Sequence, residues 1–338
     1  IRDLVRSRGL GDVYKRQLGL DGAGRNCHAC IQGLRCMKYI RKEFTNCNRN
    51  SLFRIYPLGD VHIGAASCDE TALKNWVATV KADKDGYVIC MGDLIDAIGP
   101  RDPRWNVDGL ASWLSIQDMM DICAAQKDRL FKYIAPICNK IIATVEGNHE
   151  RAIKRHYERD VYSEIAQGIK ERGGIAQDVK LQLGYYGWMH LVFSRSGKRT
   201  RGSSRLVTLN VHHGYVGGRL AGAKALNMQR WVYTHAADVS LMGHSHNLGV
   251  QIEAVERISK TGKLLIQKRL GCFTGTFMSG SDDGESYSEV KGYLPMPSSS
   301  LVLEIVPLKN DDGPRISAHA AISVSYTHLR AHETVLDL

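Results

Sequence analysis

The sequence predicts a mixed α/β protein in which two packed sheets lie between helices. In the first half of the chain, short apolar runs alternate with segments of helical periodicity, a pattern typical of βαβ units. In the second half, apolar runs of strand length follow one another with few helical segments between them. No apolar run reaches the 18 residues of a membrane-spanning helix, so no transmembrane segment is predicted.

The first half contains three short apolar runs that we interpret as buried strands. Residues 53–58 and 87–91 each run into Gly-Asp, and residues 140–145 run into Glu-Gly-Asn-His. Helical periodicity predicts helices between these strands and after the third of them, over residues 70–81, 111–134 and 150–172.

The second half is predicted to be richer in strand. Strand-like runs cover residues 206–211, 239–242, 249–258, 263–270 and 301–306. Residues 271–300 are rich in Gly, Ser, Asp and Pro, which predicts a long loop over the site. Met228, Trp231 and Tyr233 are predicted to belong to the core.

The two ends of the chain look like opposite strands of one DNA element. Residues 12–17 read Asp-Val-Tyr-Lys-Arg-Gln, and the reverse complement of a DNA that encodes them translates into residues 324–328, Val-Ser-Tyr-Thr-His. The element resembles a sequencing-library adapter. We therefore expect residues 1–36 to be an adapter-derived stretch plus a disordered upstream extension, and 324–338 to be adapter-derived. The single domain is expected over 37–323, with Met37 as the native start.

The nine cysteines are scattered, and several stand inside apolar runs. This usage favours reduced, buried thiols and a cytoplasmic location over a disulfide framework. Cys27 and Cys30 have the spacing of one half of a zinc knuckle, but Cys36 and Cys47 lack the paired spacing of the other half. An unstructured extension is therefore favoured there.

Charge points to an anionic partner. The chain carries a formal net charge of +10, which suits a polyanion such as DNA or RNA. Many basic proteins bind no nucleic acid, so charge alone does not assign one.

Five polar clusters follow apolar runs along the chain. Each one alone is a weak signal, since Gly-Asp after a strand is common, but all five in this order are specific. They read Gly59-Asp60-Val61-His62, Gly92-Asp93-Leu94-Ile95-Asp96, Gly147-Asn148-His149-Glu150, Val211-His212-His213-Gly214 and Gly243-His244-Ser245-His246.

These clusters resemble the five-motif signature of the calcineurin-like metallophosphoesterase superfamily, which implies an α/β sandwich flanked by helices. The resemblance implies that Asp60, His62, Asp93 and His246 bind one divalent metal ion. It implies that Asp93 also bridges to a second ion, held by Asn148, His244 and a histidine of the fourth motif. Family patterns leave both His212 and His213 open for that place, with His212 preferred.

These donors suit Mn²⁺ first, with Zn²⁺ or Fe as alternatives. By resemblance, His149 acts on the leaving group as a general acid, and Asp96 orients His149. Arg101 and Arg104, in the loop after the second motif, are candidates for gripping phosphate oxygens. A solvated loop explains these two arginines equally well.

We therefore expect a metal-dependent hydrolase of phosphate mono- or diesters, with a nuclease or phosphodiesterase acting on nucleic acid or nucleotides among its forms. The first alternative is a non-catalytic nucleic-acid-binding module that retains the fold. The second is another metallohydrolase, such as an amidohydrolase, in which an asparagine ligand would be unusual. The sequence leaves the oligomeric state open.

Overall fold

The computed structural model describes residues 38–100, 102–195, 204–215, 221–259, 261–279, 298–310 and 313–321. All of these belong to one unit of the chain, Lys38–Leu338. The expectations for residues 1–36 and 324–338, and for Arg101, lie outside the described residues. None of the described helices is long and apolar enough to cross a membrane.

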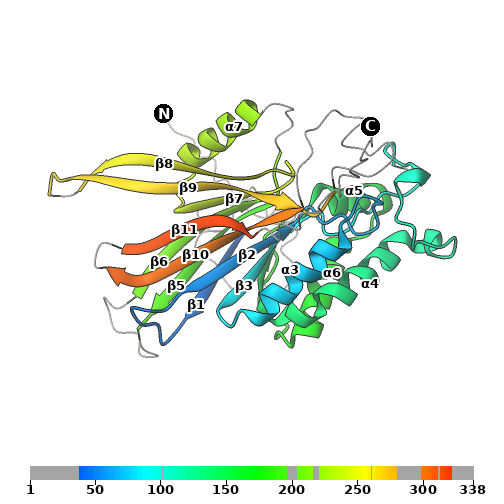
Figure 1. Cartoon of the computed structure of the whole chain (residues 1–338), viewed down its shortest axis with the longest axis horizontal. Coiled ribbons are helices and arrows are strands. Elements are labelled where there is room, and N and C mark those ends of the chain that lie inside the picture. The colour runs from blue at the N-terminus through cyan, green and yellow to red at the C-terminus, as the bar shows by residue number, and fades with distance from the viewer. Residues whose placement is uncertain are drawn as a thin grey trace, which may run out of the picture. The chain divides into compact units, whose positions relative to one another are not determined.

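The first half of the chain supplies a parallel set of strands (Figure 1). Its members are β2 (Phe53–Gly59), β3 (Gly86–Gly92) and β4 (Ile141–Thr144), paired in that order. Nearly all of their residues are buried, as expected for strands covered on both faces. On the other side of β2, β10 (Ser299–Asn310) pairs antiparallel with it, and β11 (Gly313–Ala321) pairs with β10.

The remaining strands form a second layer, ordered β1-β5-β6-β7-β9, with β8 paired to β9. Their bounds are β1 (Tyr39–Phe44), β5 (Tyr186–Ser194), β6 (Ser204–His212), β7 (Val239–Met242), β8 (Leu248–Ile258) and β9 (Leu264–Thr276). β6, β7 and β9 run parallel to one another. Two residue pairs between β9 and β10 join this layer to the first, so a continuous path of hydrogen-bonded strands links both.

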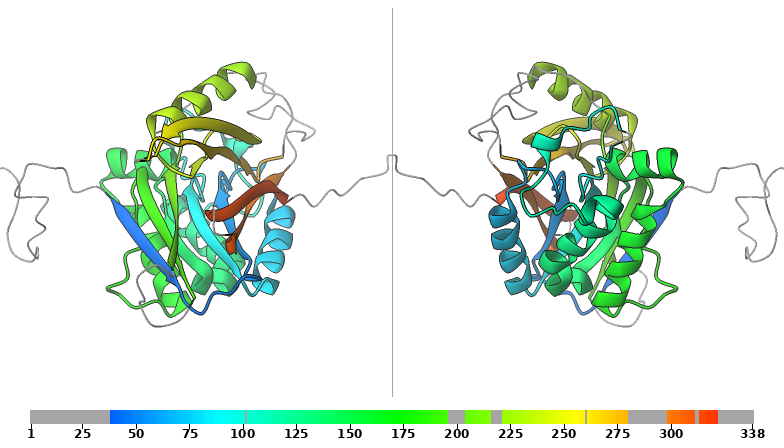
Figure 2. Two further views of the ribbon diagram at one scale, coloured as in Figure 1. Left: turned by 90° about the vertical axis from the view of Figure 1, so that its left-hand side faces the viewer. Right: turned by 90° about the vertical axis from the view of Figure 1, so that its right-hand side faces the viewer.

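The helices cover the outer faces of these two layers (Figures 1 and 2). Their bounds are α3 (Glu70–Ala82), α4 (Ile122–Ile134), α5 (Asn148–Tyr157), α6 (Val161–Gly173) and α7 (Ala221–Thr234), with short 3-10 turns η1 (Val107–Gly109), η2 (Asp118–Asp121) and η3 (Ala135–Lys140).

Three apolar clusters define the layers. The innermost contains residues of both strand layers, such as Ile55 of β2 and Leu209 of β6. A second lies between β2–β3 and helices α3, α4 and α6, and a small third one joins Met228 of α7 to Met242 and Phe273. The order helix, sheet, sheet, helix confirms the predicted α/β class.

Two predicted helices differ from the expectation because an aspartate caps a helix start inside each predicted range. The helix expected over 111–134 begins at Ile122, where the Asp121 carboxylate accepts a hydrogen bond from the Ala124 backbone N–H (3.0 Å). The helix expected over 150–172 is two helices, since Glu158 adopts a left-handed backbone (φ 56°) and Asp160 caps the second.

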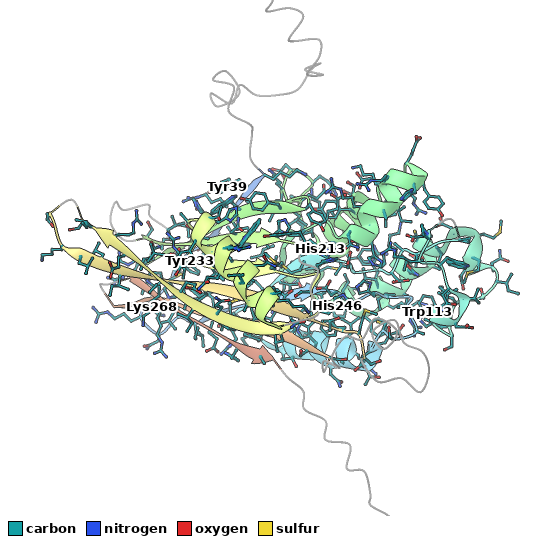
Figure 3. The ribbon with its side chains drawn as sticks, turned by 90° about the horizontal axis from the view of Figure 1, so that it is seen from above. Tyr39, Trp113, His213, Tyr233, His246 and Lys268 are labelled. Atoms are coloured by element: carbon teal, nitrogen blue, oxygen red, sulfur yellow. The ribbon has the colours of Figure 1, made fainter. Side chains whose placement is uncertain are left out.

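Other elements were not predicted. Strands β1, β5 and β11 and helix α7 are additions, and β9 continues through residues 271–276, which were expected to be loop. Residues 280–297 of that predicted loop lie outside the described residues. The core prediction holds for Met228 and is wrong for Tyr233, whose position on α7 (Figure 3) leaves it 52% exposed.

Candidate metal centre

The five polar clusters converge because of strand direction. Asp60 follows β2, Asp93 follows β3 and Asn148 begins the helix after β4, while His213 and His244 follow β6 and β7. Within each of these two strand sets the neighbours run parallel, so their carboxyl ends meet at one edge. In α/β sheets this edge is where ligands bind.

The backbone at this edge is unusual. Five of the candidate ligands have positive φ angles between 49° and 65°: Asp60, His62, Asp93, His244 and His246. Non-glycine residues adopt this left-handed conformation rarely, and such residues concentrate at functional sites. The fold therefore holds these side chains in place through tight turns.

Two glycines make the close packing of these turns possible. A Cβ on Gly147 would lie 2.1 Å from both the backbone nitrogen and a carboxylate oxygen of Asp93. Gly92 has a φ of 91°, and a Cβ there would lie 2.6 Å from the Gly147 backbone. The second and third motifs therefore touch each other only because glycine stands at both positions.

The first group of candidate ligands is Asp60, His62 and His246, whose ligand atoms all lie within 4.8 Å of one another. The Nε2 atoms of His62 and His246 are 3.3 Å apart, and Asp60 Oδ1 lies 3.7 Å from His246 Nε2. The other carboxylate oxygen, Asp60 Oδ2, accepts a hydrogen bond from the His244 backbone N–H (2.8 Å).

The second group is Asp93, His213 and His244 (Figure 3 labels His246 and His213, one from each group). Asp93 Oδ2 lies 3.2 Å from His213 Nε2 and 3.9 Å from His62 Nε2, so this oxygen faces both groups. Asn148 Oδ1 lies 2.9 Å from His213 Nε2 and thus joins the second group.

The structure separates the two histidines of the fourth motif. His213 is fully buried in the second group, where its Nδ1 lies 2.8 Å from the Met91 carbonyl oxygen. The ring of His212 packs on Trp231 (4.8 Å between centroids), and its Nδ1 accepts a hydrogen bond from the Gly214 backbone N–H. The preference for His212 thus does not match the arrangement, because His212 is the last residue of β6 and faces α7.

His149 and Asp96 lie together as expected. The Nδ1 of His149 contacts both the backbone carbonyl and the carboxylate of Asp96, and its ring packs edge-on against His62 (4.5 Å). The Nε2 of His149 lies 2.9 Å from a guanidinium nitrogen of Arg104. Asp102 holds that guanidinium through two hydrogen bonds of 3.0 and 2.8 Å.

Glu150 and Asp102 are the residues to which the sequence analysis gave no role. Glu150 is 2% exposed, and its carboxylate accepts backbone N–H groups from Asp93, Leu94 and Gly147 at 2.8–3.1 Å. The signal was available, since a glutamate at the third position of a helix often reaches back to the helix start. The Asp102–Arg104 pair could have been suspected only from its spacing of two residues.

The charges of the centre suit cations. Burial raises the pKa of the Asp60 carboxyl to about 8, and its Oδ1 has no hydrogen-bond partner among the described residues. Burial lowers the pKa of His244 to about 4 and that of His246 well below its ordinary value, so both rings are neutral and offer a lone pair. Burial opposes protonation of His213 as well, but the charges of Asp93 and Asp60 raise its pKa to about 10. The unpartnered Asp60 oxygen and the neutral rings of His244 and His246 fit a divalent cation, and a cation beside Asp93 would take the place of the His213 proton.

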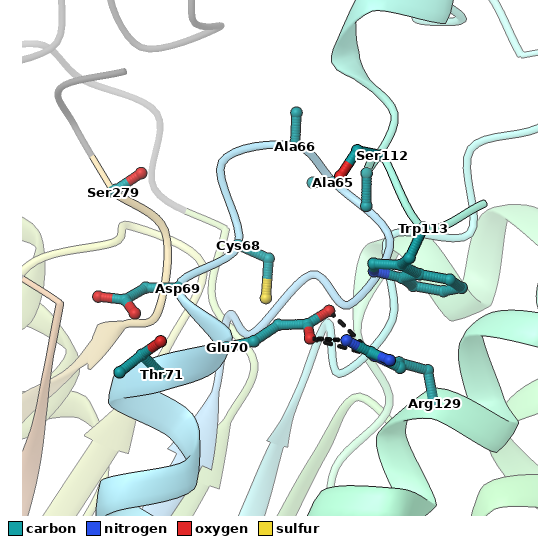
Figure 4. A pocket seen from close by; sticks show the side chains of 11 residues that line it. Ala65, Ala66, Cys68, Asp69, Glu70, Thr71, Ser112, Trp113, Arg129 and Ser279 are labelled. Carbon is teal, nitrogen blue, oxygen red and sulfur yellow. Dashed lines mark hydrogen bonds and ion pairs between the residues drawn. The ribbon is translucent and has the colours of Figure 1, made fainter. Parts of the chain in front are cut away.

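Two cavities lie near this edge. The larger, about 510 Å³, is lined by the loop after the first motif, the start of α3 and Trp113, and its Glu70–Arg129 ion pair is drawn in Figure 4. Its lining includes none of the candidate ligands. The smaller, about 350 Å³, is lined by Asn148, Arg151, Ala152, Arg155 and Tyr185.

Comparisons with solved structures return distant likenesses. Vacuolar Protein Sorting 29 from Cryptosporidium parvum is 14% identical over 80% of this chain and 97% of its own, with a TM-score of 0.33. A metallophosphoesterase from Sphaerobacter thermophilus is 14% identical (79% and 87% covered, TM-score 0.31). A protein serine/threonine phosphatase from Saccharomyces cerevisiae is 13% identical (86% and 85% covered, TM-score 0.32). Because these values are low, no residue role or substrate is transferred from them.

The sequence comparison is more informative. No curated protein sequence matches the chain. The family profile described as calcineurin-like phosphoesterase matches residues 53–248, which is more than half of the chain and includes all five polar clusters. The chain therefore belongs to the calcineurin-like phosphoesterase family.

Proposed function

We propose that this protein is a metal-dependent phosphoesterase that hydrolyses phosphate mono- or diesters with water. The observation that carries the proposal is the Asp93 carboxylate, one oxygen of which lies between His213 of one candidate group and His62 of the other. Asp60, His62, Asp93 and His246 would hold one divalent ion. Asp93, Asn148, His213 and His244 would hold the other. Mn²⁺ is the first candidate, and Zn²⁺ or Fe also suit these donors.

When bound, such a pair of ions supplies positive charge beside the phosphoryl oxygens and makes a bound water more acidic. The protein's own contribution begins with His149. Its Nδ1 side is occupied by Asp96, so Nε2 is the nitrogen that exchanges a proton with the leaving group. In this structure Nε2 accepts from the Arg104 guanidinium, which has to turn to the substrate before Nε2 can carry that proton. Asp96 keeps the ring in that orientation.

Arg104 is placed to bind a phosphoryl oxygen beside His149. Asp102 accepts two hydrogen bonds from its guanidinium and raises the pKa of Arg104, so the arginine stays charged and oriented. Arg101, three positions before Arg104 in the sequence, is proposed as a second substrate contact.

The first test measures hydrolysis of bis-p-nitrophenyl phosphate with added Mn²⁺ and after EDTA. We expect turnover that EDTA abolishes. His149→Ala should lose about 10²- to 10⁴-fold in kcat, the range of a general acid, while still binding two equivalents of metal. Loss of both metals from this variant would make His149 a structural residue and overturn its role.

A non-catalytic nucleic-acid-binding module is the second candidate, and the net charge of +10 favours it. Metal-loaded protein that binds DNA tightly and cleaves no phosphate ester would establish it in place of the hydrolase. A cytoplasmic location is proposed from the free cysteines, of which Cys90, Cys123 and Cys138 are buried.

A further inference from the structure

The smaller cavity adjoins the candidate metal centre. Asn148, one of its lining residues, reaches His213 with its side-chain oxygen (2.9 Å). Two other lining residues, Arg151 and Arg155, stand four positions apart on α5, so they share one face of that helix. A ligand in this cavity would therefore touch the centre on its Asn148 side and meet two guanidinium groups.

The charges of these two arginines are not neutralised by close carboxylates. Arg54, Arg104, Arg129 and Arg159 each form an ion pair with an aspartate or glutamate. Among the described residues, neither Arg151 nor Arg155 has a carboxylate oxygen within 4.0 Å. Both side chains are exposed, so their donors remain accessible to an anion.

Tyr185 lines one side of the cavity and has contacts through both its hydroxyl and its ring. Its hydroxyl donates a hydrogen bond to the Gly214 carbonyl oxygen (2.7 Å), and its ring packs edge-on against His213 (5.4 Å). The Arg151 guanidinium carbon lies 5.2 Å from the centre of the same ring, within cation–π range. One fixed aromatic ring thus contacts both the candidate metal ligand and the arginine.

We propose, resting on the proposed function, that this cavity binds a second, non-scissile phosphate of the substrate. Guanidinium groups bind phosphate oxygens through paired hydrogen bonds, and a volume of about 350 Å³ accommodates such a group. The substrate class is then a phosphate ester that carries another phosphate next to the bond that is cleaved. A nucleic-acid strand and a nucleoside polyphosphate both have this chemistry.

The test compares substrates with and without the second phosphate. The dinucleotide pTpT carries a 5′-phosphate beside its phosphodiester, whereas TpT and bis-p-nitrophenyl phosphate do not. The variant is Arg151→Gln/Arg155→Gln. The matched control is Lys81→Gln/Lys154→Gln, which removes the same charge from α3 and α5 outside the cavity lining.

We expect kcat/KM for pTpT to fall about 10- to 100-fold in the arginine variant, mainly through KM, with two-fold changes or less for the other two substrates. The lysine control should change none of them by more than two-fold. We also measure kcat/KM for ATP. An equal loss on all substrates, or no loss on either pTpT or ATP, overturns the inference. A selective loss on ATP without a loss on pTpT assigns the site to nucleoside polyphosphates.

Binding separates this inference from the proposed function. If the wild-type protein hydrolyses none of these esters, the proposed function fails, and the Kd of fluorescently labelled pTpT for the Mn²⁺-loaded protein decides the cavity's role. A Kd at least ten-fold weaker in Arg151→Gln/Arg155→Gln than in the lysine control supports a phosphate site. Equal Kd values overturn it.

Discussion

Glu150 offers a sharp test of how the centre is held together. Its buried carboxylate accepts hydrogen bonds from the backbone N–H groups of Leu94 (2.8 Å), Asp93 (3.0 Å) and Gly147 (3.1 Å). Glu150→Ala leaves these three donors, and the more distant Ile95 N–H (3.4 Å), without their acceptor. A buried unsatisfied donor costs about 1–3 kcal/mol, and water entering the vacated space offsets part of this, so we expect a loss of about 3 kcal/mol in the free energy of unfolding. Glu150→Gln keeps one acceptor oxygen and should lose about half as much.

Urea unfolding of the metal-free protein in EDTA measures this loss as a lower midpoint at unchanged slope. Glu171→Ala is the control, because Glu171 is exposed on α6 and contacts Gln167 (2.8 Å). We expect the control to change stability by less than about 0.5 kcal/mol. A loss below about 1 kcal/mol for Glu150→Ala would refute the reasoning, since the three N–H groups would then have other partners.

Three further outcomes are expected. Hydrogen bonds from Arg159 and Lys127 lower the pKa of Glu164 from 4.5 to about 2. The ionised Glu164 therefore stabilises the fold above pH 4.5, by a small amount because the site is partly exposed, and this contribution disappears as the pH falls toward 2. The unfolding midpoint of Glu164→Gln should be lower than that of the wild type at pH 7 and equal to it near pH 2. Asp102→Ala should raise KM for bis-p-nitrophenyl phosphate about ten-fold by releasing Arg104, and equal steady-state constants would contradict this. When free Mn²⁺ is held at 100 times its Kd, removing it should lower the free energy of unfolding by about 2.7 kcal/mol for each ion bound, and an unchanged melting temperature in EDTA would count against a metal centre.

The sequence predicted what short local patterns determine. Buried parallel strands appear as continuous apolar runs, and the polar clusters follow directly where those runs end, so the fold class and most candidate ligands were accessible. Elements β1 and β5 were missed because their apolar residues are interrupted by Arg, Lys and Glu in β1 and by Gly and His in β5. The contacts of Arg104 with His149 cross 45 positions of the chain and depend on tertiary structure.

The sequence contains a signal that distinguishes His213 from His212, and the prediction did not use it. Along β6, Val207, Leu209 and Val211 face the core between the two sheets. Because side chains alternate along a strand, the next residue in phase with them is His213, while His212 is on the opposite face. Applying the strand period to the end of the apolar run selects His213 without coordinates.

The left-handed turns at the centre limit how its chemistry can be altered. Asparagine, aspartate and glycine tolerate that backbone, whereas valine, isoleucine and threonine there would be strained regardless of available space. Asp60→Asn and Asp93→Asn should therefore change ligand charge with little disturbance of the chain path. A redesign for a different metal ion is therefore limited to these few residue types at the left-handed positions, unless the turns themselves are rebuilt.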